Sequence, residues 1–182
     1  MAPPTLMRIV VVEHDPAWRA EFEKESRSIS RVLGDRVLRV HHIGSTAIPG
    51  IFAKPVIDIL MEVENILELD ATSYAMEGLG YESMGEFGIP GRRYFRRSNA
   101  VGIRTHQVHA FESKSPDIAR HLAFRDYLIA HLAEARAYGE LKRDLAREFP
   151  EDIQGYMKGK NPFIKEHEAK ALVWWMARQA KH

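Results

Sequence analysis

The residues best suited to chemistry lie in one loop and on the strand expected to follow it. Residues 42–46 read His-Ile-Gly-Ser-Thr, Lys54 precedes the next expected strand, and Asp58 lies within that strand. A glycine lets a phosphate approach the backbone, and the N–H groups and serine hydroxyl after it can donate hydrogen bonds to that phosphate. An acid on the neighbouring strand could hold a divalent cation that bridges the phosphates, and a lysine would add positive charge. Gly44, Ser45, Lys54 and Asp58 therefore form a candidate phosphate and metal site.

The same loop also has a purely structural interpretation. A tight turn at this point would need Gly44 and Gly50 for positive φ, and Ser45 could cap a short helix. Residue spacing alone does not choose between the two interpretations.

Hydrophobic patterning predicts the elements that would position this loop. Asp15-Pro16 begins a helix that Gly34 ends, and its apolar residues recur on one face. A second helix is expected over 65–78. Strands are expected over 8–13, 36–43, 55–63, 81–86, 92–97 and 104–112, and the third is almost continuously apolar, as is typical of a strand covered on both faces. These elements form an α/β core over residues 1–113.

The remainder of the chain, residues 114–182, is predicted to be helical. Ser115-Pro116 begins a helix with an apolar face made of Ile118, Leu122, Ile129 and Leu132, and a second helix presents Tyr138, Leu141, Leu145 and Phe149. Asn161-Pro162 is expected to cap a last helix, which leaves Lys158 and Lys160 in a loop. Because so short a segment makes a marginal core by itself, the helices are expected to pack on the sheet, giving one domain over 1–182.

Composition restricts the classes of function. The chain of 182 residues has 26 Lys and Arg against 25 Asp and Glu, a net charge of +1, so nucleic acid is not an expected partner and any anion site must be local. Cysteine is absent, which excludes disulfides, thiol catalysis and thiolate metal sites. The segment Met1 to Val12 lacks the long apolar region of a signal peptide, and no apolar run is long enough to cross a membrane. A cytoplasmic protein is expected.

The chain resembles the GrpB family, whose domain belongs to the nucleotidyltransferase fold superfamily. The resemblance rests on residues 12–18, 42–50, 53–59 and 104–109, and further on Phe124-Arg125-Asp126-Tyr127-Leu128, Leu141-Lys142 and 156–160. It implies an α/β (α+β) nucleotidyltransferase-like mixed sheet with a C-terminal group of helices packed on it. It also implies that Gly44-Ser45 lines a phosphate site and that Asp58 is the first metal-binding acid.

The chain departs from the superfamily pattern at one position. Active members usually carry a second acid two residues after the first, and here Leu60 takes that place. Glu62 shares the strand face of Asp58 but lies about 13 Å away along the strand, too far for one ion. Glu112 on a neighbouring strand is the best remaining candidate for the second acid.

Several other side chains could serve the same site. His106 would share a face with Glu112, which favours it over His109, and His109 enters only through the family pattern. Arg125 lies on an apolar helix face, where a charge must be paired or must contact a ligand. The arginines of residues 92–97 are interpreted first as charges of an edge strand and second as a phosphate patch. The candidate phosphate- or nucleotide-binding residues are thus Gly44, Ser45, Thr46, Lys54, Arg104, His106, His109, Arg125 and Lys160, and the candidate catalytic residues are Asp58 and Glu112, with Asp58 also the metal ligand.

The resulting expectation is a protein that binds a nucleotide or another phosphate-bearing small molecule with Mg²⁺. If the site is catalytic, the reaction would transfer a nucleoside monophosphate to a small acceptor, with pyrophosphate leaving. Leu60 favours the alternative of a non-catalytic phosphate-binding module. A third alternative is a regulatory scaffold that acts through its helical half on a protein partner or a second copy, since GrpB-like domains also occur fused to dephospho-coenzyme A kinases.

Overall fold

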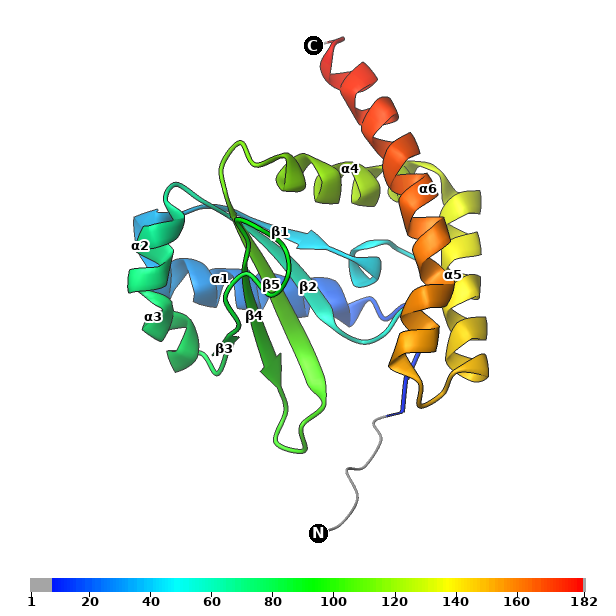
Figure 1. The fold of residues 1–182 in the computed structure, drawn as a ribbon, viewed down its shortest axis with the longest axis horizontal. Helices are drawn as coiled ribbons and strands as arrows, with labels where there is room; N and C mark the ends of the chain where they lie inside the picture. The colour runs from blue at the N-terminus through cyan, green and yellow to red at the C-terminus, as the bar shows by residue number, and fades with distance from the viewer. Residues whose placement is uncertain (1–7, 182) are drawn as a thin grey trace.

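A five-stranded mixed sheet forms the centre of the protein in a computed structural model that describes residues 8–181 (Figure 1). The strand order is β1-β2-β5-β4-β3, and only the β2–β5 pair is parallel. The strands are β1 (Val37–Ile43), β2 (Ile57–Val63), β3 (Glu82–Ser83), β4 (Arg93–Ser98) and β5 (Arg104–Glu112). The predicted fold class is confirmed: an α/β core with a mixed sheet and a C-terminal group of helices packed on it.

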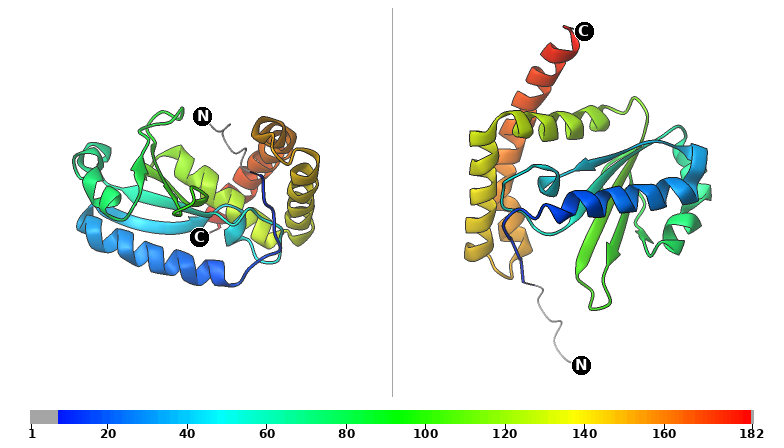
Figure 2. Two further views of the ribbon diagram at one scale, coloured as in Figure 1. Left: turned by 90° about the horizontal axis from the view of Figure 1, so that it is seen from below. Right: turned by 180° about the vertical axis from the view of Figure 1, so that it is seen from behind.

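The two faces of the sheet are covered by different parts of the chain (Figure 2). On one face, α1 (Ala17–Leu33), α2 (Ile66–Ala71) and α3 (Ser73–Gly78) pack against the odd-numbered residues of β2. On the other face, α4 (Pro116–Ala130) packs Ile118 against Leu60 and Phe111. As a result every residue of β2 except Asp58 is buried, which explains the nearly continuous apolar pattern of this strand.

The last two helices meet the loop between β1 and β2. These are α5 (Leu132–Glu148) and α6 (Ile153–Gln179), which lie side by side at one end of the sheet (Figures 1 and 2). Ile48 and Ile51 of the loop are buried in a cluster with residues of α4, α5 and α6. This packing places the C-terminal helices directly beside the Gly44-Ser45 turn.

The first helix agrees with its prediction. Trp18, Ile29 and Leu33 are buried on one face, and Gly34 ends α1 with a φ of 58°. A side chain would be strained at that angle, which is why a glycine ends the helix there.

Five predicted elements differ from the structure; besides the four described next, the strand expected over 81–86 is limited to β3 (Glu82–Ser83). Residues 8–13 form no strand, only a single bridge between Val12 and Ala53. The predicted helix over 65–78 is broken at Thr72 into α2 and α3. Of the residues predicted for the buried face of the helix after Ser115-Pro116, Ile129 lies within α4 but is 41% exposed. Leu132 is 56% exposed and belongs to α5, because α4 ends at Ala130.

The fourth difference is at Pro162, which lies inside α6 and does not begin a helix. Asp152 caps α6 ten residues earlier by accepting a hydrogen bond from the N–H of Gly155. The helix continues through the proline because the neighbouring Phe163 and Ile164 pack against the cluster at Ile48 and Ile51, and tertiary packing outweighs the one lost backbone hydrogen bond.

None of the helices within residues 8–181 combines the length and the apolar character that crossing a membrane requires. The sequence-based expectation about a targeting peptide concerns a segment whose residues 1–7 lie outside the described part of the chain.

Candidate functional site

The candidate site is built where β1 ends opposite Asp58. Ile43, the last residue of β1, pairs with Asp58 on β2, and Gly44 follows with a φ of 72°. A Cβ atom on Gly44 would lie 2.5 Å from Oδ2 of Asp58, closer than a real side chain allows. Gly44 is therefore required both for the turn and for the approach of the carboxylate. The structure brings the predicted glycine, serine and aspartate together.

Thr46 has a structural place in this turn. Its buried hydroxyl donates to the carbonyl of Val56 and contacts Nε2 of His42 at 2.9 Å, so it ties the turn to the beginning of β2. Burial lowers the pKa of His42 to about 4, against the opposing effect of Asp58, and the ring stacks on Phe22 of α1. His42 is thus neutral at pH 7.

Three lysines from separate segments lie near Asp58, and we call Lys54, Lys142 and Lys160 the lysine cluster. Lys54 precedes β2, Lys142 lies on α5 and Lys160 on α6. Burial lowers the pKa of each of them, and the Asp58 carboxylate opposes that lowering in all three. The pKa of Lys160 is lowered further by Lys54, and that of Lys142 by Lys160. The three ammonium groups and Asp58 therefore form one electrostatic unit.

Lys142 is the most deeply buried member of the lysine cluster. It is 2% exposed, its Nζ donates a hydrogen bond of 2.5 Å to Oγ of Ser45, and its pKa falls to about 7, chiefly by burial. The other two ammonium groups face the ring of the buried Tyr156, with Nζ of Lys54 at 5.8 Å and Nζ of Lys160 at 5.1 Å from the ring centroid.

The carboxylate of Asp58 is accessible. Its side chain is 27% exposed, and its nearest ionisable partner is His109, whose Nε2 lies 3.8 Å from Oδ1. Arg104 borders the same region, since it donates to the hydroxyl of Tyr94 at 3.2 Å and its charge lowers the pKa of Lys54. Asp58 is not paired with an arginine.

Comparison with known proteins identifies the family. A family model described as "GrpB: GrpB protein" matches residues 8–170. The chain belongs to the GrpB family. The UPF0157 protein YqkA of Bacillus subtilis (strain 168) is 40% identical to it over 171 residues, 94% of this chain and 49% of YqkA, so the chain spans about half the length of that relative.

Solved structures extend the comparison. The crystal structure of conserved protein GrpB from Enterococcus faecalis matches with a TM-score of 0.87 and 44% identity, covering 92% of this chain and 99% of that one. The Cid1 poly(U) polymerase matches with a TM-score of 0.47 and 9% identity over 72% of this chain and 45% of its own. The structural similarity to nucleotidyltransferases is thus weak and carries no argument about function.

Two predictions on the GrpB-family histidines are reversed. β2 and β5 are parallel with Asp58 opposite Gln107 and Leu60 opposite His109, so His109 shares the face of Asp58. His106 lies on the other face, where Nη2 of Arg97 is 3.1 Å from its Nδ1 and Glu21 is 3.7 Å away. Burial and Arg97 lower the pKa of His106 to about 4. His106 is therefore not placed to contact a phosphate at Gly44-Ser45.

The prediction that Glu112 supplies the second acid is wrong in its geometry. Glu112 pairs with Val63 at the far end of β2, and its carboxylate accepts a hydrogen bond of 3.0 Å from the N–H of Ile66 at the beginning of α2. Glu62 is likewise engaged, 2.6 Å from Nε2 of His41. Within residues 8–181, no group of three or more His, Asp or Glu side chains is arranged to hold a metal ion.

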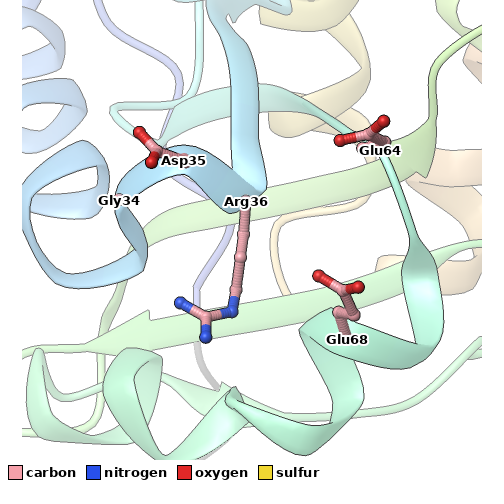
Figure 3. A pocket seen from close by; sticks show the side chains of 5 residues that line it. All are labelled: Gly34, Asp35, Arg36, Glu64 and Glu68. Carbon is pink, nitrogen blue, oxygen red and sulfur yellow. The ribbon is translucent and has the colours of Figure 1, made fainter.

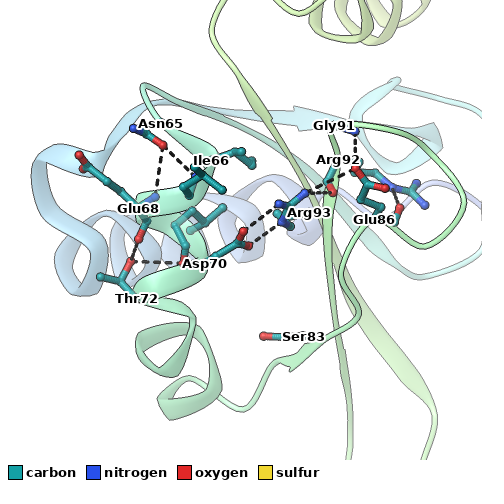
Figure 4. Close-up of polar contacts among 12 residues, drawn as sticks. Asn65, Ile66, Glu68, Asp70, Thr72, Ser83, Glu86, Gly91, Arg92 and Arg93 are labelled. Carbon is teal, nitrogen blue, oxygen red and sulfur yellow. Dashed lines mark hydrogen bonds and ion pairs between the residues drawn. The ribbon is translucent and has the colours of Figure 1, made fainter.

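Arg125 and the arginines of residues 92–97 interact with other protein groups. Arg125 forms an ion pair with Asp126 at 2.7 Å and donates to the carbonyl of His42, so it fastens the end of β1 to α4. In the arginine-rich strand, the basic side chains meet protein acceptors, as Figure 4 shows for Arg93 with Asp70 and for Arg92 with backbone carbonyls. Arg96 and Arg97 pair with Glu82 and Glu25. This strand therefore supplies no free phosphate patch.

Lys142 is not among the predicted site residues, although the Leu141-Lys142 pair is part of the family resemblance. Its helix showed only a surface pattern around it, whereas the structure buries it against Ser45. Lys160 was selected, but it lies in α6 and not in the predicted loop.

Two surface cavities lie elsewhere. One, of about 500 Å³, is lined by Gly34, Asp35, Arg36, Glu64 and Glu68 (Figure 3). The other, of about 600 Å³, is lined by residues 8–13 together with Phe52, Arg143, Ala146 and Arg147. Neither is lined by Asp58 or by the lysine cluster.

Proposed function

We propose that this GrpB-family protein binds the phosphates of a nucleotide or another phosphate-bearing small molecule at the turn Gly44-Ser45. The observation that carries the proposal is the convergence of three lysines from separate segments near Asp58, one of which, Lys142, donates a hydrogen bond to Ser45. The proposed ligand carries several negative charges, because three ammonium groups face a single carboxylate.

The electrostatics of the ligand-free site support an anionic ligand. Removing an ammonium group from water disfavours its charged form, and buried charges in proteins are normally paired. Burial lowers the pKa of each lysine in the cluster, and the nearby carboxylate of Asp58 only partly offsets that lowering. A polyphosphate would supply negative charge and raise the pKa of all three lysines again.

The side chains fit one Mg²⁺ ion shared with the ligand. Mg²⁺ commonly binds to one or two carboxylates together with substrate phosphates and waters. Asp58 would supply the protein oxygen, and the ion would neutralise phosphate charge beside the lysine cluster. A pair of metal ions does not fit, because the position of the second acid is the fully buried Leu60. This favours a binding function over nucleotidyl transfer.

The proposal is tested by ligand-induced thermal stabilisation and titration calorimetry. The four nucleoside triphosphates and inorganic tripolyphosphate are each added with and without Mg²⁺. A ligand present at about 100 times its dissociation constant should stabilise the folded state by about 2.7 kcal/mol. If none of the five raises the melting temperature, the proposed function is wrong.

Matched variants connect binding to the cluster. Lys160→Ala should weaken binding at least about tenfold, because it removes one charged contact from a partly buried site. Lys158→Ala, two residues earlier on the same helix and exposed, should leave the affinity unchanged. Release of pyrophosphate from a nucleoside triphosphate, lost in Asp58→Asn, would instead support nucleotidyl transfer.

A further inference from the structure

Phe87 is held in an unusual position. This residue belongs to the loop between β3 and β4, is 57% exposed and has a positive φ of 47°. A bulky residue rarely adopts such a backbone angle, and an aromatic ring gains little by facing water. Strained, exposed residues persist when the surrounding structure fixes them, and they are concentrated at binding sites.

The loop around Phe87 is fixed by a buried arginine. Arg92 is 7% exposed, and its guanidinium donates to the carbonyl of Phe87 at 2.7 Å and to that of Glu86 at 3.1 Å. The carboxylate of Glu86 in turn accepts a hydrogen bond of 2.8 Å from the N–H of Gly91 (Figure 4). The ring is therefore presented by a loop with defined internal contacts.

A row of neighbouring rings connects Phe87 to Asp58. Phe87 stacks on Tyr94 with 5.1 Å between ring centroids and an interplanar angle of 26°. Tyr94 lies 5.4 Å from the ring of His109, and His109 reaches to within 3.8 Å of Asp58. Tyr94 itself is 6% exposed, so the outer face of Phe87 is the accessible end of the row.

The row and the lysine cluster are also linked by charge. Arg104 donates to the hydroxyl of Tyr94, and the same arginine lowers the pKa of Lys54. The Asp58 carboxylate in turn raises the pKa of Tyr94, an effect secondary to burial. Both features therefore lie near the same carboxylate.

We propose that Phe87 is a stacking platform for the base of a nucleotide whose phosphates lie at the lysine cluster. The inference rests on the proposed function and narrows its ligand from phosphate-bearing molecules in general to those that carry a flat aromatic ring. Stacking on a phenyl ring accepts any base, because every base has a π-face. The platform therefore adds affinity for nucleotides without selecting among them.

The test compares ligands with and without a base. Dissociation constants are measured by calorimetry in Mg²⁺ for ATP, UTP and inorganic tripolyphosphate, with the unmodified protein and with Phe87→Gly. Glycine removes the ring and accepts the positive φ, so the loop is retained. Tyr74→Ala, an exposed aromatic residue on α3, is the matched control.

Phe87→Gly should weaken the binding of ATP and of UTP about tenfold to hundredfold, the range for loss of one base–aromatic stack. The affinity for tripolyphosphate should stay unchanged. Tyr74→Ala should alter none of the three. Equal loss of all three ligands in Phe87→Gly, or unchanged ATP and UTP, would overturn the platform while leaving phosphate binding intact. Absence of binding by all three to the unmodified protein would overturn the proposed function, and the platform with it.

Discussion

Replacing Lys142 by methionine should reveal how much the burial of this ammonium group destabilises the folded protein. Methionine has a similar length and no charge, so the substitution removes the buried ammonium group and its hydrogen bond to Ser45. Lys142 has its usual pKa of 10.5 in the unfolded chain and about 7 in the folded protein, chiefly because burial disfavours its charged form.

The direction of the pH dependence follows from these two pKa values. Below pH 7 the lysine is protonated in both states, and the full burial penalty destabilises the folded protein. Between pH 7 and 10.5 the folded state releases the proton while the unfolded state keeps it, so the penalty falls by about 1.4 kcal/mol per pH unit. Above pH 10.5 Lys142 contributes no penalty.

The size of the effect is measured as a difference between two proteins. The free energy of unfolding of Lys142→Met relative to the unmodified protein should fall by about 2 kcal/mol from pH 7 to pH 9. Urea denaturation at the two pH values gives this quantity, and groups that titrate alike in both proteins cancel. The comparison is made without ligand, because a bound polyanion would restore the charge of Lys142.

A difference in stability that stays the same from pH 7 to pH 9 would show that Lys142 keeps an ordinary pKa. The buried ammonium would then be satisfied in the ligand-free protein, and the electrostatic argument for a polyanion would fail.

Two further predictions concern the turn and the rejected acid. Gly44→Ala should lower the free energy of unfolding by about 2–4 kcal/mol, because the new side chain meets both the positive φ and Asp58. Gly50→Ala should lower it by only about 1–2 kcal/mol, because Gly50 also has a positive φ, of 77°, but open space around it. Equal losses in urea denaturation would contradict the close approach. Glu112→Ala should reduce stability by about 0.5–1 kcal/mol through the lost contact with Ile66, and calorimetry should show unchanged binding of ATP with Mg²⁺. Loss of Mg²⁺-dependent binding in that variant would instead make Glu112 a metal ligand.

Local features of the sequence predicted the parts of the fold that depend on neighbouring residues. The 3.6-residue period of Trp18, Ile29 and Leu33 predicts the buried face of α1, and Gly34 predicts its end. The proximity of Gly44 to Asp58 was also predictable, because strands consecutive in the chain usually pair, and antiparallel pairing brings the end of one beside the beginning of the next.

The sequence pattern misplaced features that depend on longer-range packing. Pro162 indicated a helix start, but contacts of α6 with the Ile48 and Ile51 cluster carry the helix through it. The choice of His106 over His109 failed because the face shared with Asp58 is set by the parallel register of β2 and β5, which no local pattern contains.

The sequence by itself indicated that Gly44, Ser45 and Asp58 lie near one another, since they belong to the end of one expected strand and the beginning of the next, and consecutive strands usually pair. Only the tertiary structure decided what surrounds them. Lys142 stands 97 residues from Ser45 along the chain, and the hydrogen bond between them exists because α5 packs against the β1–β2 loop. A lysine on a helix is ordinarily a solvated charge, and burial against a distant element is what turns this one into part of a candidate phosphate site.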